Sequence, residues 1–361
     1  MPCRRSLRQS GDTKPDGVPL VDSCGAAVIL HPGAIALFIG EALVIALSLY
    51  ASSLGIGLLR HWDINSSSEG QLRLERRTYL ISTLMSYVML YEVLSTFLYI
   101  YTLDAIHLVF VGAMCATGSL NANDVGWYVL YLKIVLFFLS ASWIAINHLD
   151  NRAEDYPLIR AKYRLLLLIT PVIVLDGVLL MRYFIGLRPD IITSCCGSLF
   201  SDEGKKVAGD ISALPIKTMM KVFYASAAFL LSLIALAITL KSAVFRYLTA
   251  VGSFIFFFIA VLSIVSFVSI YFYELPTHHC PFDILQQAYG YVGYPLYGSL
   301  FAGVFFGVIS GVAQSFKRIP SLTTTVEAAQ RVWLVLAAIG ISVFVAICTW
   351  PIVFSSFRVD M

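Results

Sequence analysis

Eight apolar runs, each long enough to form a membrane-spanning helix, dominate this sequence of 361 residues. A helix of about 20 apolar residues crosses roughly 30 Å of hydrocarbon and satisfies its own backbone, as lipid requires. A membrane barrel would instead show short segments of alternating hydrophobicity. The runs cover residues 33–59, 79–103, 126–148, 165–187, 217–240, 247–273, 292–314 and 332–356. We therefore predict an all-α, polytopic integral membrane helix bundle with about eight transmembrane helices.

The composition leaves little room for a soluble domain. Charged residues make up only 13% of the chain, whereas they make up about a quarter of an ordinary soluble protein. Residues 1–30 are basic and lack apolar periodicity, which indicates a disordered N-terminal tail. Residues 31–361 are predicted to form a single eight-helix transmembrane domain.

The distribution of Lys and Arg predicts the orientation of the helices, because cytoplasmic links carry an excess of both. One set of alternate links holds 13 of these residues and the other set holds 3. The basic set comprises the links 60–78, 150–164, 241–246 and 316–331, which are predicted to be cytoplasmic. Loops 104–125, 188–215 and 274–297 then form an extracytoplasmic cap, and both termini lie outside. We expect a multi-pass protein of the plasma (inner) membrane.

The three cap loops carry four thiols and two adjacent imidazoles. In an oxidising compartment, four thiols on one face could form two structural disulfide bonds. Thiolates and imidazoles are also the preferred ligands of copper(I) and zinc. The candidate metal ligands are Cys115, Cys195, Cys196, His278, His279 and Cys280. The adjacent imidazoles favour a metal site, since a disulfide staple does not need them.

Seven charged residues lie inside the apolar runs, and four of them are far from the run ends. Glu41, Glu92 and Asp176 are each roughly 8 to 11 residues from the outer end of their run, and Lys133 is about 7 residues from it, which predicts a similar depth for all four. Charges in hydrocarbon are costly and commonly mark a proton relay, an ion path or a polar ligand site. They could line a cofactor-binding cavity beneath the cap, or neutralise one another in a network that only orders the helices.

These patterns support three functional hypotheses. The first is handling of a soft metal, most suited to copper, at the outer face, with a cation or proton path below. The second is a membrane subunit of a redox complex with a quinone, metal or haem site, although every His lies at or beyond the boundary of a predicted span rather than within it. The third is an assembly subunit whose cysteines form structural disulfides.

The expected surroundings are the lipid bilayer and a partner membrane protein or an extracytoplasmic redox or metal-carrier protein. The net charge of +3 arises at helix ends, so we expect no nucleic-acid partner. Motifs for nucleotide phosphates and for the familiar hydrolases are absent from the sequence. Any energy for transport would therefore come from an ion gradient or a partner subunit.

Overall fold

The computed structural model shows a helical protein, as the apolar runs predict. It describes residues 28–61, 68–153, 155–188, 215–355 and 357. Within these ranges there is no β-strand, and eight helices are long and apolar enough to cross a membrane. The prediction of an all-α membrane bundle with eight spans is therefore confirmed. The outward placement of both termini stays a prediction, and most of the predicted tail lies outside the described residues.

The helices group into two compact units, residues 1–195 (unit 1) and 196–361 (unit 2). Each unit contains four of the long helices. Unit 1 comprises α3 (Pro32–His61), α4 (Glu69–Ile106), the short elements η1 (His107–Val109) and α5 (Ala116–Asn121), and then α6 (Gly126–Asp150) and α7 (Ile159–Ile185). The prediction that all eight spans act as a single domain stays a prediction.

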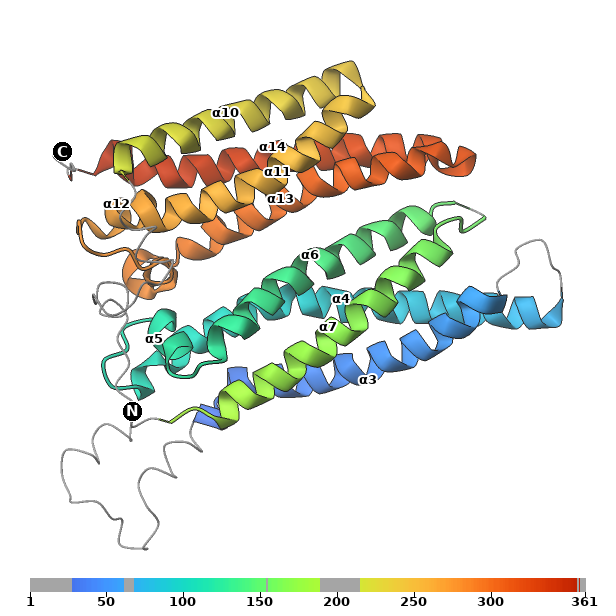
Figure 1. Ribbon diagram of the computed structural model, residues 1–361, viewed down its shortest axis with the longest axis horizontal. Helices are drawn as coiled ribbons and strands as arrows, with labels where there is room; N and C mark the ends of the chain where they lie inside the picture. Colours follow the sequence, from blue (N-terminus) through green and yellow to red (C-terminus); the bar gives the residue numbers. More distant parts are fainter. Residues whose placement is uncertain (1–27, 62–67, 154, 189–214, 356, 358–361) are drawn as a thin grey trace, which may run out of the picture. The chain divides into compact units, whose positions relative to one another are not determined.

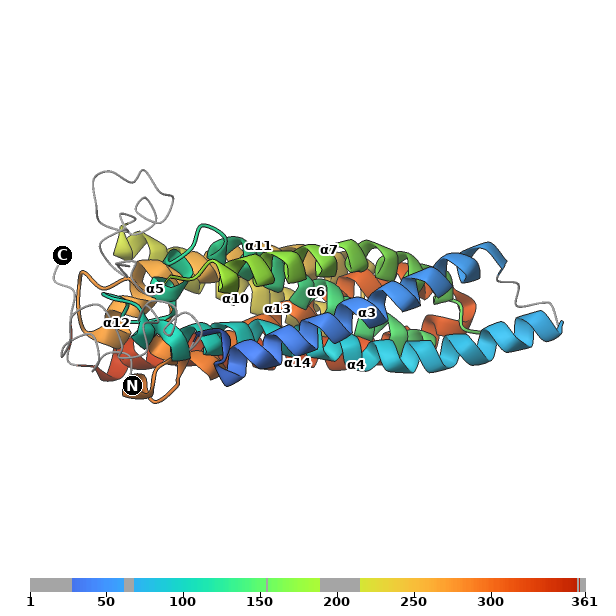
Figure 2. The same cartoon turned by 90° about the horizontal axis from the view of Figure 1, so that it is seen from below.

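Unit 1 is a bundle in which each long helix packs against two others. Helix α4 lies between α3 and α6, and α7 closes the ring against the same two helices. Figure 2 shows α3 running alongside α7 and α4. This arrangement turns one face of every helix towards a common centre.

Unit 2 has the same cyclic order of four spans. It comprises α10 (Ile216–Leu240), α11 (Ala243–Ser263), the π-helical turn η2 (Ile264–Val268), α12 (Ser269–Tyr273), η3 (Asp283–Leu285), η4 (Gln287–Tyr289), α13 (Gly293–Gln314), η5 (Ser315–Arg318), η6 (Pro320–Leu322) and α14 (Thr323–Phe354). The turn η2 joins α11 to α12 without a break in the helical path, so the three form one span. Helix α11 packs against α10 and α13, and α14 contacts both α10 and α13.

The two units have cores of different chemistry. In unit 2, the ring of Phe223 lies 5.7 to 6.1 Å, between centroids, from the rings of Phe256, Phe267 and Phe344. Such aromatic clusters bury large apolar surfaces. The core of unit 1 combines mostly aliphatic side chains with six buried charged residues, described below. Charge is thus concentrated at the centre of unit 1.

Two helices begin well before the apolar run that predicts them. Helix α4 begins at Glu69, ten residues before the predicted span, and α14 begins at Thr323. The Oγ of Ser68 caps α4 by accepting a hydrogen bond from the amide of Gln71, and Glu69 pairs with Arg73 one turn later. Hydropathy locates the part of a helix inside lipid, whereas capping decides where the helix starts.

Helices α13 and α14 approach closely at glycines. A Cβ atom on Gly303 would lie 2.8 Å from the amide nitrogen of Ile341 and 3.1 Å from the carbonyl carbon of Gly340. We expect Gly303→Leu to lower the free energy of unfolding by about 1 to 3 kcal/mol, because the backbone of α14 must move. Gly298→Leu, on the same helix with open space around it, should leave stability unchanged. Thermal unfolding in detergent distinguishes the two variants, and equal midpoints would contradict the close approach.

Candidate functional site

The four charged residues predicted at one depth meet at the centre of unit 1. The Nζ atom of Lys133 lies 2.7 Å from Oδ2 of Asp176, 2.9 Å from Oε2 of Glu41 and 3.6 Å from Oε2 of Glu92. Each residue comes from a different long helix, and all four are buried. We call this group the charged centre.

Neighbouring residues hold the charged centre in place. Thr96 Oγ1 donates a hydrogen bond to the backbone carbonyl of Lys133 at 3.0 Å, which ties α4 to α6. Ser95 Oγ lies 3.4 Å from Oε2 of Glu92. Next to Asp176, a Cβ atom on Gly177 would lie 3.1 Å from Cγ of Glu41, so glycine lets α3 approach α7 here.

The charged centre contains more acid than base. Three carboxyl groups face one ammonium group, so full ionisation would leave two uncompensated negative charges in a buried place, at high cost. Oε1 of Glu41, Oε1 of Glu92 and Oδ1 of Asp176 are buried without a hydrogen-bond partner among the described residues. The centre therefore requires bound protons or a second cation to be neutral, and this chemistry suits proton or ion exchange.

Unit 1 contains a second buried ion pair, which the sequence does not predict. Lys162 Nζ lies 2.7 Å from Oδ2 of Asp150 and donates to Oδ1 of Asn147 at 3.0 Å. The other carboxylate oxygen of Asp150 accepts a hydrogen bond from the amide of Leu158 at 2.8 Å. Both charges lie at the end of an apolar run, where sequence alone predicts exposure to water. The sequence does contain one indication of this burial. The spacing of Lys133, Asn147 and Asp150 places all three on one face of α6.

The loop between α12 and α13 in unit 2 carries the candidate metal ligands of the third cap loop. Cys280 is completely buried and His279 nearly so. Tyr273 OH donates to the carbonyl of Cys280 at 2.6 Å and accepts from the amide of Ile284 at 3.0 Å. Tyr297 OH donates to the carbonyl of Pro281 at 2.6 Å. Two tyrosines from the flanking helices therefore position this thiol–imidazole loop, residues 274–292.

In each imidazole of the loop, one ring nitrogen contacts an oxygen atom. Nδ1 of His279 lies 2.9 Å from the carbonyl oxygen of Val265 in the π-helical turn η2. A carbonyl only accepts, so Nδ1 of His279 donates this hydrogen bond. Nε2 of His278 contacts Oδ2 of Asp283. Hydrogen bonds of this kind set the tautomer and orientation of metal-binding histidines.

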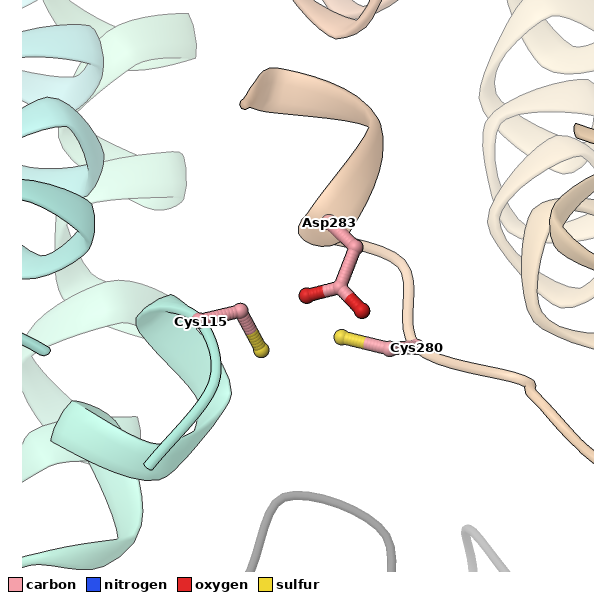
Figure 3. Close-up of side chains that lie close together, drawn as sticks. All are labelled: Cys115, Cys280 and Asp283. Atoms are coloured by element: carbon pink, nitrogen blue, oxygen red, sulfur yellow. The ribbon is translucent and has the colours of Figure 1, made fainter. Parts of the chain in front are cut away.

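Asp283 is the residue that the structure adds to the predicted ligands. Figure 3 shows Asp283 at the beginning of η3 and Cys280 on the preceding loop, with the thiol directed towards the carboxylate. The Sγ atom and a carboxylate oxygen lie within 4.8 Å of each other. Asp283 is buried, and its Oδ1 has no hydrogen-bond partner among the described residues. Thiolate, carboxylate and imidazole groups are all ligands of zinc, and the thiolate also suits copper(I).

The other predicted thiols belong to other segments of the sequence. Cys115, labelled in Figure 3, is the buried residue that immediately precedes α5 in unit 1. Cys195 and Cys196 lie outside the described residues. Cys280 and Cys348, the cysteines described in unit 2, are not joined to each other by a disulfide bond. The structure therefore gives no support to the predicted disulfide bonds, which stay predictions.

Comparison with protein-family models, curated proteins and solved structures found no match for this chain. The functional conclusion therefore depends on the two groups of residues described above. The charged centre of unit 1 gathers three buried carboxyl groups around one ammonium group. The thiol–imidazole loop of unit 2 presents a buried thiol next to an unpartnered carboxylate oxygen.

Proposed function

We propose that the chain is a multi-pass protein of the plasma membrane that handles a soft metal ion, most suited to copper, at the thiol–imidazole loop. The observation that carries this proposal is the pairing of the buried Cys280 thiol with the buried Asp283 carboxylate. The Oδ1 atom of Asp283 has no hydrogen-bond partner among the described residues. Burying such an atom is costly, and a bound cation would remove that cost. The predicted outer placement of the loop would give it access to metal carried by an extracytoplasmic partner.

The residues of the loop favour a soft or borderline ion over a hard one. A thiolate selects copper(I) or zinc, whereas calcium and magnesium prefer sites made entirely of oxygen ligands. Nδ1 of His279 donates to the carbonyl of Val265, which orients this imidazole within the loop. On sequence grounds, Cys115, Cys195 and Cys196 remain in the pool of predicted ligands.

The charged centre supplies a second property that metal transport requires. Transport of a cation against its gradient needs a source of energy, such as a counter-flow of protons, and the sequence contains no nucleotide-binding motif. We propose that Glu41, Glu92 and Asp176 take up and release protons around Lys133. Their excess of acid over base supports this role.

The experiment that tests the proposed function is elemental analysis of the detergent-purified protein, with thiol counting on the same sample. We expect stoichiometric copper or zinc that disappears in a Cys280→Ser, His278→Ala, His279→Ala variant. Cys348→Ala, which removes a buried thiol from α14, should keep the metal. Absence of metal, with thiols that react only after reduction, would overturn the proposal and favour structural disulfides. Visible absorbance or a response to quinol would favour the redox subunit instead.

A further inference from the structure

A cleft of about 470 Å³ opens at the end of unit 1 where α4 begins and α6 ends. Its walls come from the first turns of α4, the link after α6 and the beginning of α7. Six polar residues that line it are Glu75, Arg76, Thr78, Ser82, Asn151 and Lys162. The cleft lies within unit 1 and has no part in the charged centre or the thiol–imidazole loop.

The floor of the cleft is polar, buried and held by neighbouring residues. Lys162 is 1% exposed and is fixed by Asp150 and Asn147. Ser82 is 3% exposed, and its side chain bonds to that of Tyr163. The floor thus has the properties of a built polar site.

The lining of the cleft favours a negatively charged ligand. The guanidinium of Arg76 and the amide of Asn151 can donate hydrogen bonds to a ligand, and Glu75 is the single carboxylate among the lining residues. The ammonium of Lys162 has at most one N–H left after its contacts with Asp150 and Asn147. Glu75 already accepts a hydrogen bond from Gln71 at 3.0 Å. The segments 69–79 and 150–164 together contain 7 Lys and Arg against 5 Asp and Glu. This excess of basic residues around Arg76 favours an anion.

The outer wall of the cleft is apolar and faces away from the bundle. Tyr79 and Leu80 line it and are 61% and 67% exposed. Both lie on α4, within a span that is apolar enough to cross a membrane. Side chains of this kind on the outside of a spanning helix contact acyl chains. The cleft therefore combines a polar floor with a wall suited to hydrocarbon.

We propose that this cleft binds an anionic phospholipid. The phosphate would lie against Arg76 and above Lys162, and an acyl chain would follow Leu80 along α4. Basic pockets between transmembrane helices bind lipid headgroups in this manner. The lipid would join the beginning of α4 to the link after α6 and so stabilise this end of unit 1.

The test is a native mass-spectrometry titration of the full chain in detergent. The probes are phosphatidylglycerol, phosphatidylcholine and inorganic phosphate. We expect phosphatidylglycerol to bind more tightly than the other two, and Arg76→Gln to weaken its binding about five-fold, since one Arg near a charged membrane surface contributes about 1 kcal/mol. Arg318→Gln, an exposed arginine at the end of η5 in unit 2, is the matched control and should leave the affinity unchanged.

Three results would overturn the proposal. Equal binding of phosphatidylcholine would show that the headgroup charge is not recognised. Binding of inorganic phosphate as tight as that of phosphatidylglycerol would show that the apolar wall has no function. An equal loss of phosphatidylglycerol binding in Arg76→Gln and Arg318→Gln would show that the cleft is not the binding place.

Discussion

Lys133→Met is expected to lower the free energy of unfolding by about 3 to 5 kcal/mol, which is the usual effect of removing one partner from a buried ion pair. Lys133 is the only cation within 4.0 Å of the carboxylates of Glu41, Glu92 and Asp176 in the described chain. Without it, three acidic groups are buried together and must all take up protons or repel one another. Thermal unfolding in detergent and the yield of folded protein measure the loss.

Two further variants test whether the loss of stability in Lys133→Met arises from the unpaired acidic groups. Lys221→Met makes the same change at an exposed position of α10 and should alter stability by less than about 0.5 kcal/mol. Adding Glu41→Gln, Glu92→Gln and Asp176→Asn to Lys133→Met should recover much of the stability, because the unpaired acids are removed together. If Lys133→Met were as stable as Lys221→Met, the charged centre would not be held by electrostatics.

Cys280→Ser is expected to lower the affinity for copper(I) by at least about 100-fold, because a hydroxyl is a poor ligand for a soft ion. The buried position of Cys280 gives the thiol a fixed place in the loop, and the hydrogen bond from Tyr273 to its carbonyl holds the backbone. Serine has almost the same volume, so the fold should be retained. Competition with a coloured copper(I) chelator measures the affinity.

Asp283→Asn is expected to have a smaller effect than Cys280→Ser. Asp283 contacts His278 and lies next to Cys280, and loss of such a supporting group usually weakens metal binding about 10- to 100-fold. Glu274→Gln changes an exposed carboxylate at the start of the same loop and serves as the control. Unchanged copper affinity in both Cys280→Ser and Asp283→Asn would place the metal elsewhere.

Part of the charged centre could be predicted from the sequence. Counting residues from the helix ends predicts a similar depth for Glu41, Glu92, Lys133 and Asp176, and the structure brings these four side chains together. Depth follows from hydropathy and the helical rise, which are local properties. A network in which these four residues neutralise one another is one of the two predicted arrangements. Its geometry could not be predicted, because it depends on which helix faces turn inwards.

Other features depend on contacts that no local pattern reveals. Asp283 takes part in the thiol–imidazole loop because Tyr273 and Tyr297 fold the chain back on itself. The burial of Lys162 and Asp150 depends on the packing of α6 against α7. The π-helical turn, whose Val265 carbonyl receives the bond from His279, has no signature in an apolar run. Each of these arises from tertiary structure, so the sequence alone predicts the class of site and not its geometry.

The central claim is that Cys280 and an imidazole of the same loop bind one metal ion. X-ray absorption at the copper edge of the copper-loaded protein tests it most directly, because it identifies the atoms bound to the metal. The account predicts at least one sulfur and one imidazole nitrogen, with the sulfur signal reduced in Cys280→Ser and the imidazole signal reduced when both His278 and His279 are replaced by Ala. A copper spectrum that is the same in all three proteins would contradict the account.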